Sequence, residues 1–258
     1  FTYGVSAPVV DVDSYLNGVA DYVSKADVLA ISATTLNQEA TRAGYYLDLT
    51  PLINSDPDIN PEDFYSVMYE SYQWDLGFWA LPASTDVISL VYKPEAFDQA
   101  GVEYPQPWWT MDDFENAMRA LAEYDNNGNV LKPAFVDFTG NSSSIFLSLL
   151  GQGMYDDSLI PSLPTFTDPM LEDLVTQWTD LQKDGFIGLL ADADLELTPP
   201  MALAPSLFAY NTTDENPSDI AMLPGGAVSL NVNGFGISTG TQYPEAAYEL
   251  IKFLTASP

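Results

Sequence analysis

The stretch Ala80–Tyr92 has the sequence ALPASTDVISLVY and decides the predicted fold class. Its last six residues, Val87–Tyr92, form a short apolar run that is typical of a strand buried on both faces. A second such run, Ala26–Ile31, lies earlier in the chain. Helical patterns surround both runs, and this alternation predicts an α/β fold with mostly parallel strand pairing.

Five longer helices are predicted from their start signals. Asp11 or Asp13 can cap the first helix, and Asn60-Pro61, Asp168-Pro169 and Pro244 open three others. Thr110–Asp113 resembles a capping box in which Asp113 stands where Glu or Gln is usual. The predicted inward faces include Val12, Tyr15 and Val19, then Phe64, Val67 and Met68, then Met111, Phe114 and Met118, then Leu174, Val175 and Trp178, and finally Ala247, Leu250, Ile251 and Leu254.

The composition excludes several classes of function. Thirty-seven acidic residues against seven basic ones give a net charge of −30, which repels phosphate backbones and anionic membranes, so nucleic acid is excluded as a partner. The chain has no Cys and no His, which removes Ser-His-Asp and Cys-His catalysis and zinc sites built on imidazole or thiolate. Only carboxylate chemistry remains, and we expect no cofactor.

The segment Asp125–Asn129 has the sequence DNNGN and resembles part of a calcium-binding loop. It lacks the glycine at the sixth position and the distal acid of an EF-hand, and Asn-Gly is a common turn sequence. We interpret the segment as a tight turn and expect no metal.

Several segments resemble, in order, motifs of extracellular (periplasmic-type) solute-binding protein family 1. These are ABC-transporter sugar-binding proteins similar to maltose-binding protein. Each motif alone is weak, but their order covers nearly the whole chain. The matching segments are Ala26–Ala30, Gly44–Pro51, Ala80–Tyr92, Phe97–Gly101, Pro107–Phe114, Leu147–Gly153, Gly185, Ala221–Gly226, Gly234–Ser238 and Pro244–Leu254. The chain departs from the family pattern at two places: Lys93 replaces an Asn, and Leu197–Ala204 replaces the family's F-x-x-Gk-aAM segment.

The resemblance implies a two-lobe, type II periplasmic-binding-protein-like fold, in which mixed sheets are flanked by helices and the ligand cleft lies between the lobes. We place lobe I at residues 1–133 plus 232–258 and lobe II at 134–231. The family pattern implies further elements at both ends, including a first strand and helix of lobe I. We therefore expect either an excised piece of a longer chain or a shortened variant, and favour the former.

Ligands of open α/β sheets bind beyond the carboxyl ends of strands, which directs attention to the polar loops there. We expect Thr34 and Thr35 to follow the first long strand, and we expect a turn at Ala83–Asp86. A sugar ring has hydroxyls and an apolar face, so a stacked aromatic is also expected. The candidate ligand-binding residues are Thr34, Thr35, Trp79, Thr85, Asp86, Asn141, Ser142, Ser206, Tyr210, Asn233 and Phe235.

The predicted function is capture of a small solute, a sugar or oligosaccharide, for delivery to a membrane ABC-transporter permease. Such a protein would be a monomer located extracellularly, at the cell surface or in the periplasm. One alternative is a ligand-sensing or scaffold domain of a larger extracellular protein. Another is a glycoside-acting enzyme, because two carboxylates suffice for that reaction.

Overall fold

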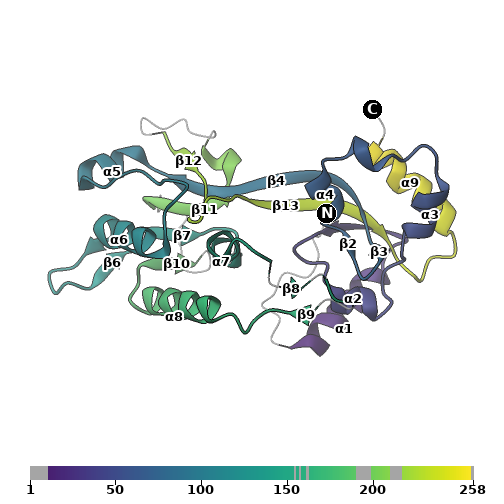
Figure 1. The fold of residues 1–258 in the computed structure, drawn as a ribbon, viewed down its shortest axis with the longest axis horizontal. Helices are drawn as coiled ribbons and strands as arrows, with labels where there is room; N and C mark the ends of the chain where they lie inside the picture. The colour runs from purple at the N-terminus through teal and green to yellow at the C-terminus, as the bar shows by residue number, and fades with distance from the viewer. Residues whose placement is uncertain are drawn as a thin grey trace. The chain divides into compact units, whose positions relative to one another are not determined.

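The computed structural model describes residues 11–153, 155–156, 158–160, 163–189, 199–209 and 217–256. These residues form two compact units (Figure 1). Unit 1 contains the described residues of 1–85, 157–162 and 231–258, and unit 2 contains those of 86–156 and 163–230. The strands β4 (Leu81–Tyr92) and β13 (Ser229–Ile237) each have residues in both units.

Each unit combines helices and strands. Unit 1 contains α1 (Val12–Val23), β1 (Val28–Ser32), α2 (Gln38–Arg42), α3 (Thr50–Ser55), a 3-10 turn at Pro61–Asp63, α4 (Ser66–Glu70), β2 (Gln73–Trp74), β3 (Gly77–Phe78) and α9 (Pro244–Ala256). Unit 2 contains α5 (Pro94–Ala100), α6 (Met111–Leu121), β5 (Glu123–Tyr124), β6 (Val130–Lys132), β7 (Phe135–Asp137), α7 (Ser143–Leu150), β8 (Tyr155–Asp156), β9 (Leu163–Pro164), α8 (Pro169–Lys183), β10 (Ile187–Leu189), β11 (Met201–Pro205), a 3-10 turn at Ser206–Ala209 and β12 (Asp219–Ala221).

The largest sheet is mixed, with the strand order β1-β13-β4-β11-β7-β10 and with β12 also paired to β4. The pairs β1–β13, β4–β11 and β4–β12 are antiparallel, whereas β7 pairs in parallel with both β10 and β11. The expectation of mostly parallel pairing is therefore wrong, and the expected mixed sheet is confirmed. An apolar run predicts that a strand is buried but does not fix the direction of its neighbours.

The predicted turn at Ala83–Asp86 is also wrong. These four residues lie inside β4, which continues for twelve residues from Leu81 to Tyr92. Their side chains are exposed or half-buried, unlike the buried run Ile88–Tyr92 that follows. Residues 83–86 are small or polar because this part of the strand is exposed, and the same residue types are common in turns.

The predicted helix starts are mostly confirmed. The Asp11 side chain caps α1, Asp168 caps α8, and Thr110 and Asp113 form the reciprocal bonds of a capping box at α6. The segment after Asn60 instead makes a 3-10 turn and the separate short α4, because Phe64 and Tyr65 have extended backbones. Five residues of the predicted inward faces are exposed: Val12, Val67, Val175, Leu250 and Leu254.

The tight turn predicted at Asp125–Asn129 is confirmed. The Gly128 N–H donates to the Asp125 carbonyl at 3.1 Å, and Gly128 has a φ of 86°. The Asp125 carboxylate accepts bonds from the N–H groups of Asn127 and Asn129, both at 2.8 Å. Throughout the described ranges, no group of three or more acidic side chains is placed to hold a metal ion.

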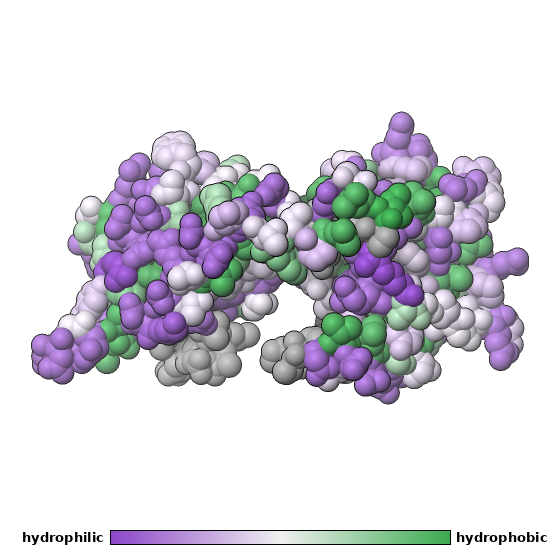
Figure 2. Space-filling model, turned by 60° about the horizontal axis from the view of Figure 1, so that its bottom comes forward, coloured by the Kyte–Doolittle hydropathy of each residue, from purple (hydrophilic) through white to green (hydrophobic). Residues whose placement is uncertain are grey.

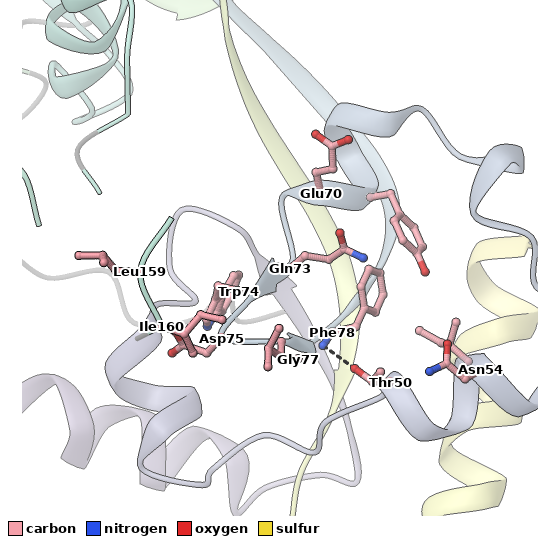
Figure 3. A pocket seen from close by; sticks show the side chains of 13 residues that line it. Thr50, Asn54, Glu70, Gln73, Trp74, Asp75, Gly77, Phe78, Leu159 and Ile160 are labelled. Atoms are coloured by element: carbon pink, nitrogen blue, oxygen red, sulfur yellow. Dashed lines mark hydrogen bonds between the residues drawn. The ribbon is translucent and has the colours of Figure 1, made fainter. Parts of the chain in front are cut away.

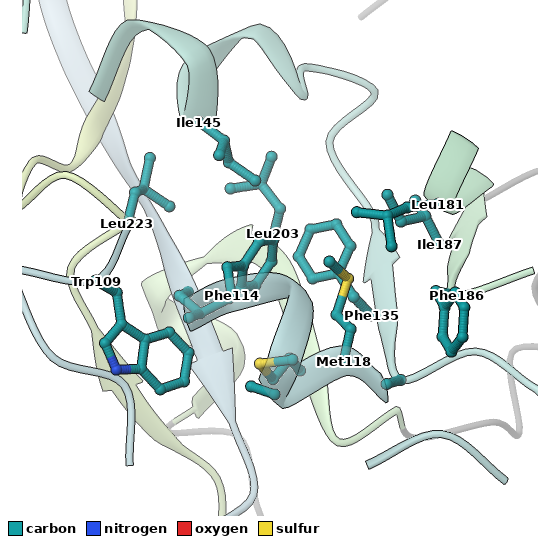
Figure 4. Close-up of a cluster of buried hydrophobic side chains, with 14 of the residues drawn as sticks. Trp109, Phe114, Met118, Phe135, Ile145, Leu181, Phe186, Ile187, Leu203 and Leu223 are labelled. Atoms are coloured by element: carbon teal, nitrogen blue, oxygen red, sulfur yellow. The ribbon is translucent and has the colours of Figure 1, made fainter. Parts of the chain in front are cut away.

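Unit 2 has an aromatic core between its sheet and helices (Figure 4). The Phe135 ring of β7 meets Phe114 of α6 edge-on at 5.2 Å between centroids and meets Trp178 of α8 at 5.8 Å. Phe114 and Phe135 are fully buried, and rings of this size contribute much of the burial free energy of a core. The apolar stripes of α6 and α8 therefore fix these helices on the sheet.

Unit 1 has a separate core in which α3 and α9 lie side by side (Figure 1). Ile53 of α3 and Ile251 of α9 are buried in it together with Ile237 of β13. An ion pair between Lys252 and Asp56, at 2.9 Å, joins the same two segments at the edge of the core. Residues 86–133, which are predicted above to belong to lobe I, lie in unit 2, and the assignment to lobes stays a prediction.

The visible surface is mostly hydrophilic with smaller hydrophobic patches (Figure 2). This agrees with the large excess of acidic residues in the sequence. Within the part of the chain that the structure describes, every helix is too short or too polar to cross a bilayer.

Candidate functional site

Four polar side chains meet in unit 1 where β1 ends: Ser32, Thr34, Asn231 and Asn233, here called the unit 1 polar group. The antiparallel register of β1 and β13 pairs Ser32 with Asn233. The Ser32 hydroxyl donates to Asn231 Oδ1 at 2.7 Å and lies 2.8 Å from Thr34 Oγ1. The Asn233 amide donates to the Asn231 carbonyl at 3.3 Å.

A fully buried tyrosine, Tyr72, joins the two strands that carry the unit 1 polar group. The Tyr72 hydroxyl donates to the carbonyls of Ile31 and Val232, at 2.9 and 3.0 Å, and so ties β1 to β13 beside the group. Burial raises the pKa of Tyr72 above its ordinary value, which keeps this donor protonated. Gly234 is required here, because a Cβ would lie 2.4 Å from the Leu81 carbonyl oxygen and 3.0 Å from the Tyr72 ring.

The unit 1 polar group contains only hydroxyls and amides. Such groups both donate and accept hydrogen bonds, so they match the hydroxyls of a neutral ligand. None of the four side chains titrates in the physiological pH range, which suits reversible binding rather than proton transfer.

Unit 2 presents a second polar segment, the loop between β7 and α7. Asp137 is 1% exposed and its Oδ1 accepts bonds from the Thr139 N–H, the Thr139 hydroxyl and the Gly140 N–H, at 2.8 to 2.9 Å. Its Oδ2 accepts a bond from the Ser142 hydroxyl at 2.7 Å. The buried carboxylate therefore shapes this loop, and the candidate residues Asn141 and Ser142 are held within it.

Ser206 follows β11 in unit 2 and is the first residue of the 3-10 turn Ser206–Ala209. Its hydroxyl donates to the Val87 carbonyl at 3.0 Å and lies 2.9 Å from the Ser89 hydroxyl. Thr85 and Asp86 directly precede Val87 in β4, where Asp86 is exposed and Thr85 is half-buried. Tyr210 lies outside the described residues.

Three other candidates in unit 1 have structural contacts of their own. The Thr35 hydroxyl donates to the Ser32 carbonyl at 3.0 Å, as in an ordinary turn. Trp79 donates through Nε1 to the Trp74 carbonyl at 3.2 Å. Phe235 is half-buried and packs against the unit 1 core. The ligand role of every candidate residue stays a prediction.

Sequence reasoning missed three residues that organise these segments: Ser32, Asn231 and Asp137. Asn231 and Asn233 are two residues apart in a strand and therefore share a face, and this spacing was the available signal. Asp137 follows a short apolar run and precedes Thr139-Gly140, a pattern that fits an acidic side chain folding back on its own loop.

The family comparison matches residues 20–258 to the model of the bacterial extracellular solute-binding proteins. The chain belongs to this family. Membership confirms the resemblance drawn from the sequence motifs and implies a periplasmic or cell-surface location. None of the curated proteins matches this solute-binding protein in sequence.

Solved structures of substrate-binding proteins share the fold of this solute-binding protein. An ABC substrate-binding protein from Listeria monocytogenes, in complex with cycloalternan, has a TM-score of 0.68 at 18% identity, over 95% of this chain and 66% of that one. A solute-binding protein from Thermotoga lettingae bound with α-D-tagatose has a TM-score of 0.65 at 15% identity, over 94% and 66%. UgpB from Mycobacterium tuberculosis, in complex with glycerophosphocholine, has a TM-score of 0.67 at 16% identity, over 95% and 64%.

These similarities confirm the periplasmic-binding-protein fold. The solute-binding protein described here spans about two thirds of the length of each of these three structures.

Proposed function

We propose that this protein captures a neutral sugar or sugar alcohol for an ABC transporter and is not an enzyme. The observation that carries the proposal is the unit 1 polar group, in a chain that belongs to a solute-binding family. Proteins of the same fold are described in complex with cycloalternan, α-D-tagatose and D-mannitol. Delivery to a permease, and binding in the predicted interlobe cleft, are parts of the same proposal.

Charge favours a neutral ligand over an anionic one. The net charge of −30 opposes the approach of phosphate-bearing solutes, and the unit 1 polar group contains no cation that would offset this. UgpB, whose complex contains the phosphodiester glycerophosphocholine, shares the fold at 16% identity. The ligand class therefore rests on the chemistry of the site rather than on the fold.

Calorimetric titration with a panel of neutral sugars and sugar alcohols tests the proposal. We expect one member of the panel to bind, and Asn231→Ala to weaken its binding by about tenfold or more, because the substitution removes an amide of the site and the acceptor that orients the Ser32 hydroxyl. Asn17→Ala, at an exposed position of α1, is the matched control and should bind as the parent does. Hydrolysis of a glycoside during the titration would contradict the non-enzymatic part of the proposal.

A further inference from the structure

A pocket in unit 1 lies beside the β2–β3 hairpin and shares no residue with the unit 1 polar group. Its volume is about 550 Å³, which is within the range of small-molecule sites. Figure 3 shows Glu70 and Gln73 on one side of this hairpin pocket and Asn54 of α3 on the other. Leu159 and Ile160 complete the lining from a separate segment.

The tip of the hairpin has an unfavourable backbone conformation. Asp75 and Leu76 have φ values of 50° and 64°, in the left-handed region where glycine is favoured at the second position of such a turn. Asp75 is held there by Arg42, whose Nε and Nη2 atoms lie 2.7 and 3.2 Å from its two carboxylate oxygens. Leu76 is 81% exposed, so packing does not explain why an aliphatic residue occupies this position.

Exposed aliphatic side chains line one part of the pocket. Leu76, Leu159 and Ile160 are 81%, 44% and 66% exposed. An apolar wall that faces water is typical of a surface that a ligand covers. Three residues from two segments of the chain therefore provide apolar area at a single pocket.

The indole of Trp74, which also lines the pocket, is held in a fixed orientation. Its Nε1 donates to Thr41 Oγ1 at 2.9 Å, and its ring stacks on Trp79 at 6.2 Å between centroids. Gly77 makes room for this pair, since a Cβ there would lie 2.5 Å from the Trp79 ring. Because the indole is already fixed, little conformational entropy is lost when a flat apolar face of a ligand packs against it.

The polar lining favours hydroxyl groups. Asn54, Glu70 and Gln73 line the pocket with two amides and one carboxylate, which are groups that form hydrogen bonds with hydroxyls. Asp75 is paired with Arg42, which leaves Glu70 as the uncompensated charge of the lining. This arrangement repels anions and supplies both donors and acceptors to neutral hydroxyls.

We propose that the hairpin pocket binds one neutral sugar ring, whose apolar face packs on Trp74 and the aliphatic wall and whose hydroxyls contact Glu70 and Gln73. This site is additional to the proposed transport site. A short apolar wall and a few exposed polar groups predict weak, millimolar binding.

The test follows the indole N–H signal of Trp74 in the NMR spectrum of the ¹⁵N-labelled protein, assigned with Trp74→Phe. Methyl α-D-glucopyranoside and maltose are the neutral probes, and glucose 1-phosphate is the anionic one. We expect a saturable shift of this signal with the neutral probes and a weaker response to the phosphate. Gln73→Ala and Leu76→Gly should each weaken the response by about fivefold, and Asn17→Ala should not.

Leu76→Gly also separates binding from folding. It should raise the melting temperature by relieving the backbone strain while weakening sugar binding. Asn231→Ala, which weakens the proposed transport site, should leave the Trp74 response intact, so the two proposals can fail independently. The proposal is overturned if the Trp74 signal does not respond saturably, if both variants respond as the parent does, or if the phosphate binds best.

Discussion

At the scale of single residues, Gly225 has the most restrictive surroundings among the glycines with positive φ. Its φ is 92°, and a Cβ would lie 2.3 Å from the carbonyl oxygen of Ser148. Gly128 has a similar φ of 86° but has nothing within 4 Å of the corresponding position. We expect Gly128→Ala to cost about 1 kcal/mol of unfolding free energy and Gly225→Ala about 3 kcal/mol or more. Equal midpoints for the two variants in urea would contradict this account.

Asp137 permits a second prediction at the residue scale. Its carboxylate accepts four hydrogen bonds while almost fully buried, so Asp137→Ala leaves several donors in the β7–α7 loop unpaired. We expect a loss of about 3 kcal/mol, and increased proteolysis within residues 138–143. Asp125→Ala removes a turn carboxylate whose hydrogen bonds are exposed to solvent, so it is the control and should cost less. A variant as resistant to urea and protease as the parent would show that Asp137 does not organise the loop.

At the scale of the element, α6 depends on its capping box. Thr110 Oγ1 accepts a bond from the Asp113 N–H at 3.2 Å, and Asp113 Oδ2 accepts one from the Thr110 N–H at 2.9 Å. Thr110→Ala should cost about 1 kcal/mol at neutral pH. Thr179→Ala, inside α8, should cost little, since alanine has the higher helix propensity.

The cap also predicts a pH dependence. Bonds from the Thr110 N–H and hydroxyl lower the pKa of Asp113 in the folded protein. A lowered folded-state pKa gives a stabilisation that is complete above the unfolded-state pKa and is lost as the pH falls through the folded-state value. The cost of Thr110→Ala should therefore shrink in acid, and a cost that is constant from neutral pH down through the aspartate range would contradict the assignment.

The helices also show how far local patterns could be predicted. Start signals such as Asp11, Thr110 and Asp168 were found because a cap acts within one turn of its own helix. The buried faces were less certain, and Leu250 is exposed although Ile251 beside it is fully buried. Apolar spacing indicates the presence of a stripe, but which of two adjacent apolar residues turns inward depends on the neighbouring elements.

At the scale of the whole molecule, the net charge of −30 predicts a dependence on salt. Only seven basic residues are available to offset 37 acidic ones, so self-repulsion destabilises the folded state. We expect the melting temperature to rise as NaCl is added, because screening shortens the range of this repulsion. Sucrose at equal osmolality controls for general solvent effects. A melting temperature that is independent of NaCl would contradict the expectation.

The whole-molecule fold was predictable because its motifs occur in a fixed order along the chain, ending with Pro244–Leu254. The candidate site was predictable only in part. Thr34 and Asn233 were selected, yet their neighbours Ser32 and Asn231 come together across 199 positions of sequence through the pairing of β1 and β13. Pairing between distant strands decides such contacts, and no local pattern contains that information.

The central claim is that this solute-binding protein holds a neutral sugar or sugar alcohol through the unit 1 polar group. Calorimetric titration of the parent protein, Asn231→Ala and Asn17→Ala against one panel of neutral sugars tests it most directly. The account predicts that the parent and Asn17→Ala bind the same sugar with equal affinity and that Asn231→Ala binds it about tenfold more weakly or not at all. Equal binding by all three proteins, or no binding of any neutral sugar by the parent at millimolar concentration, would contradict it.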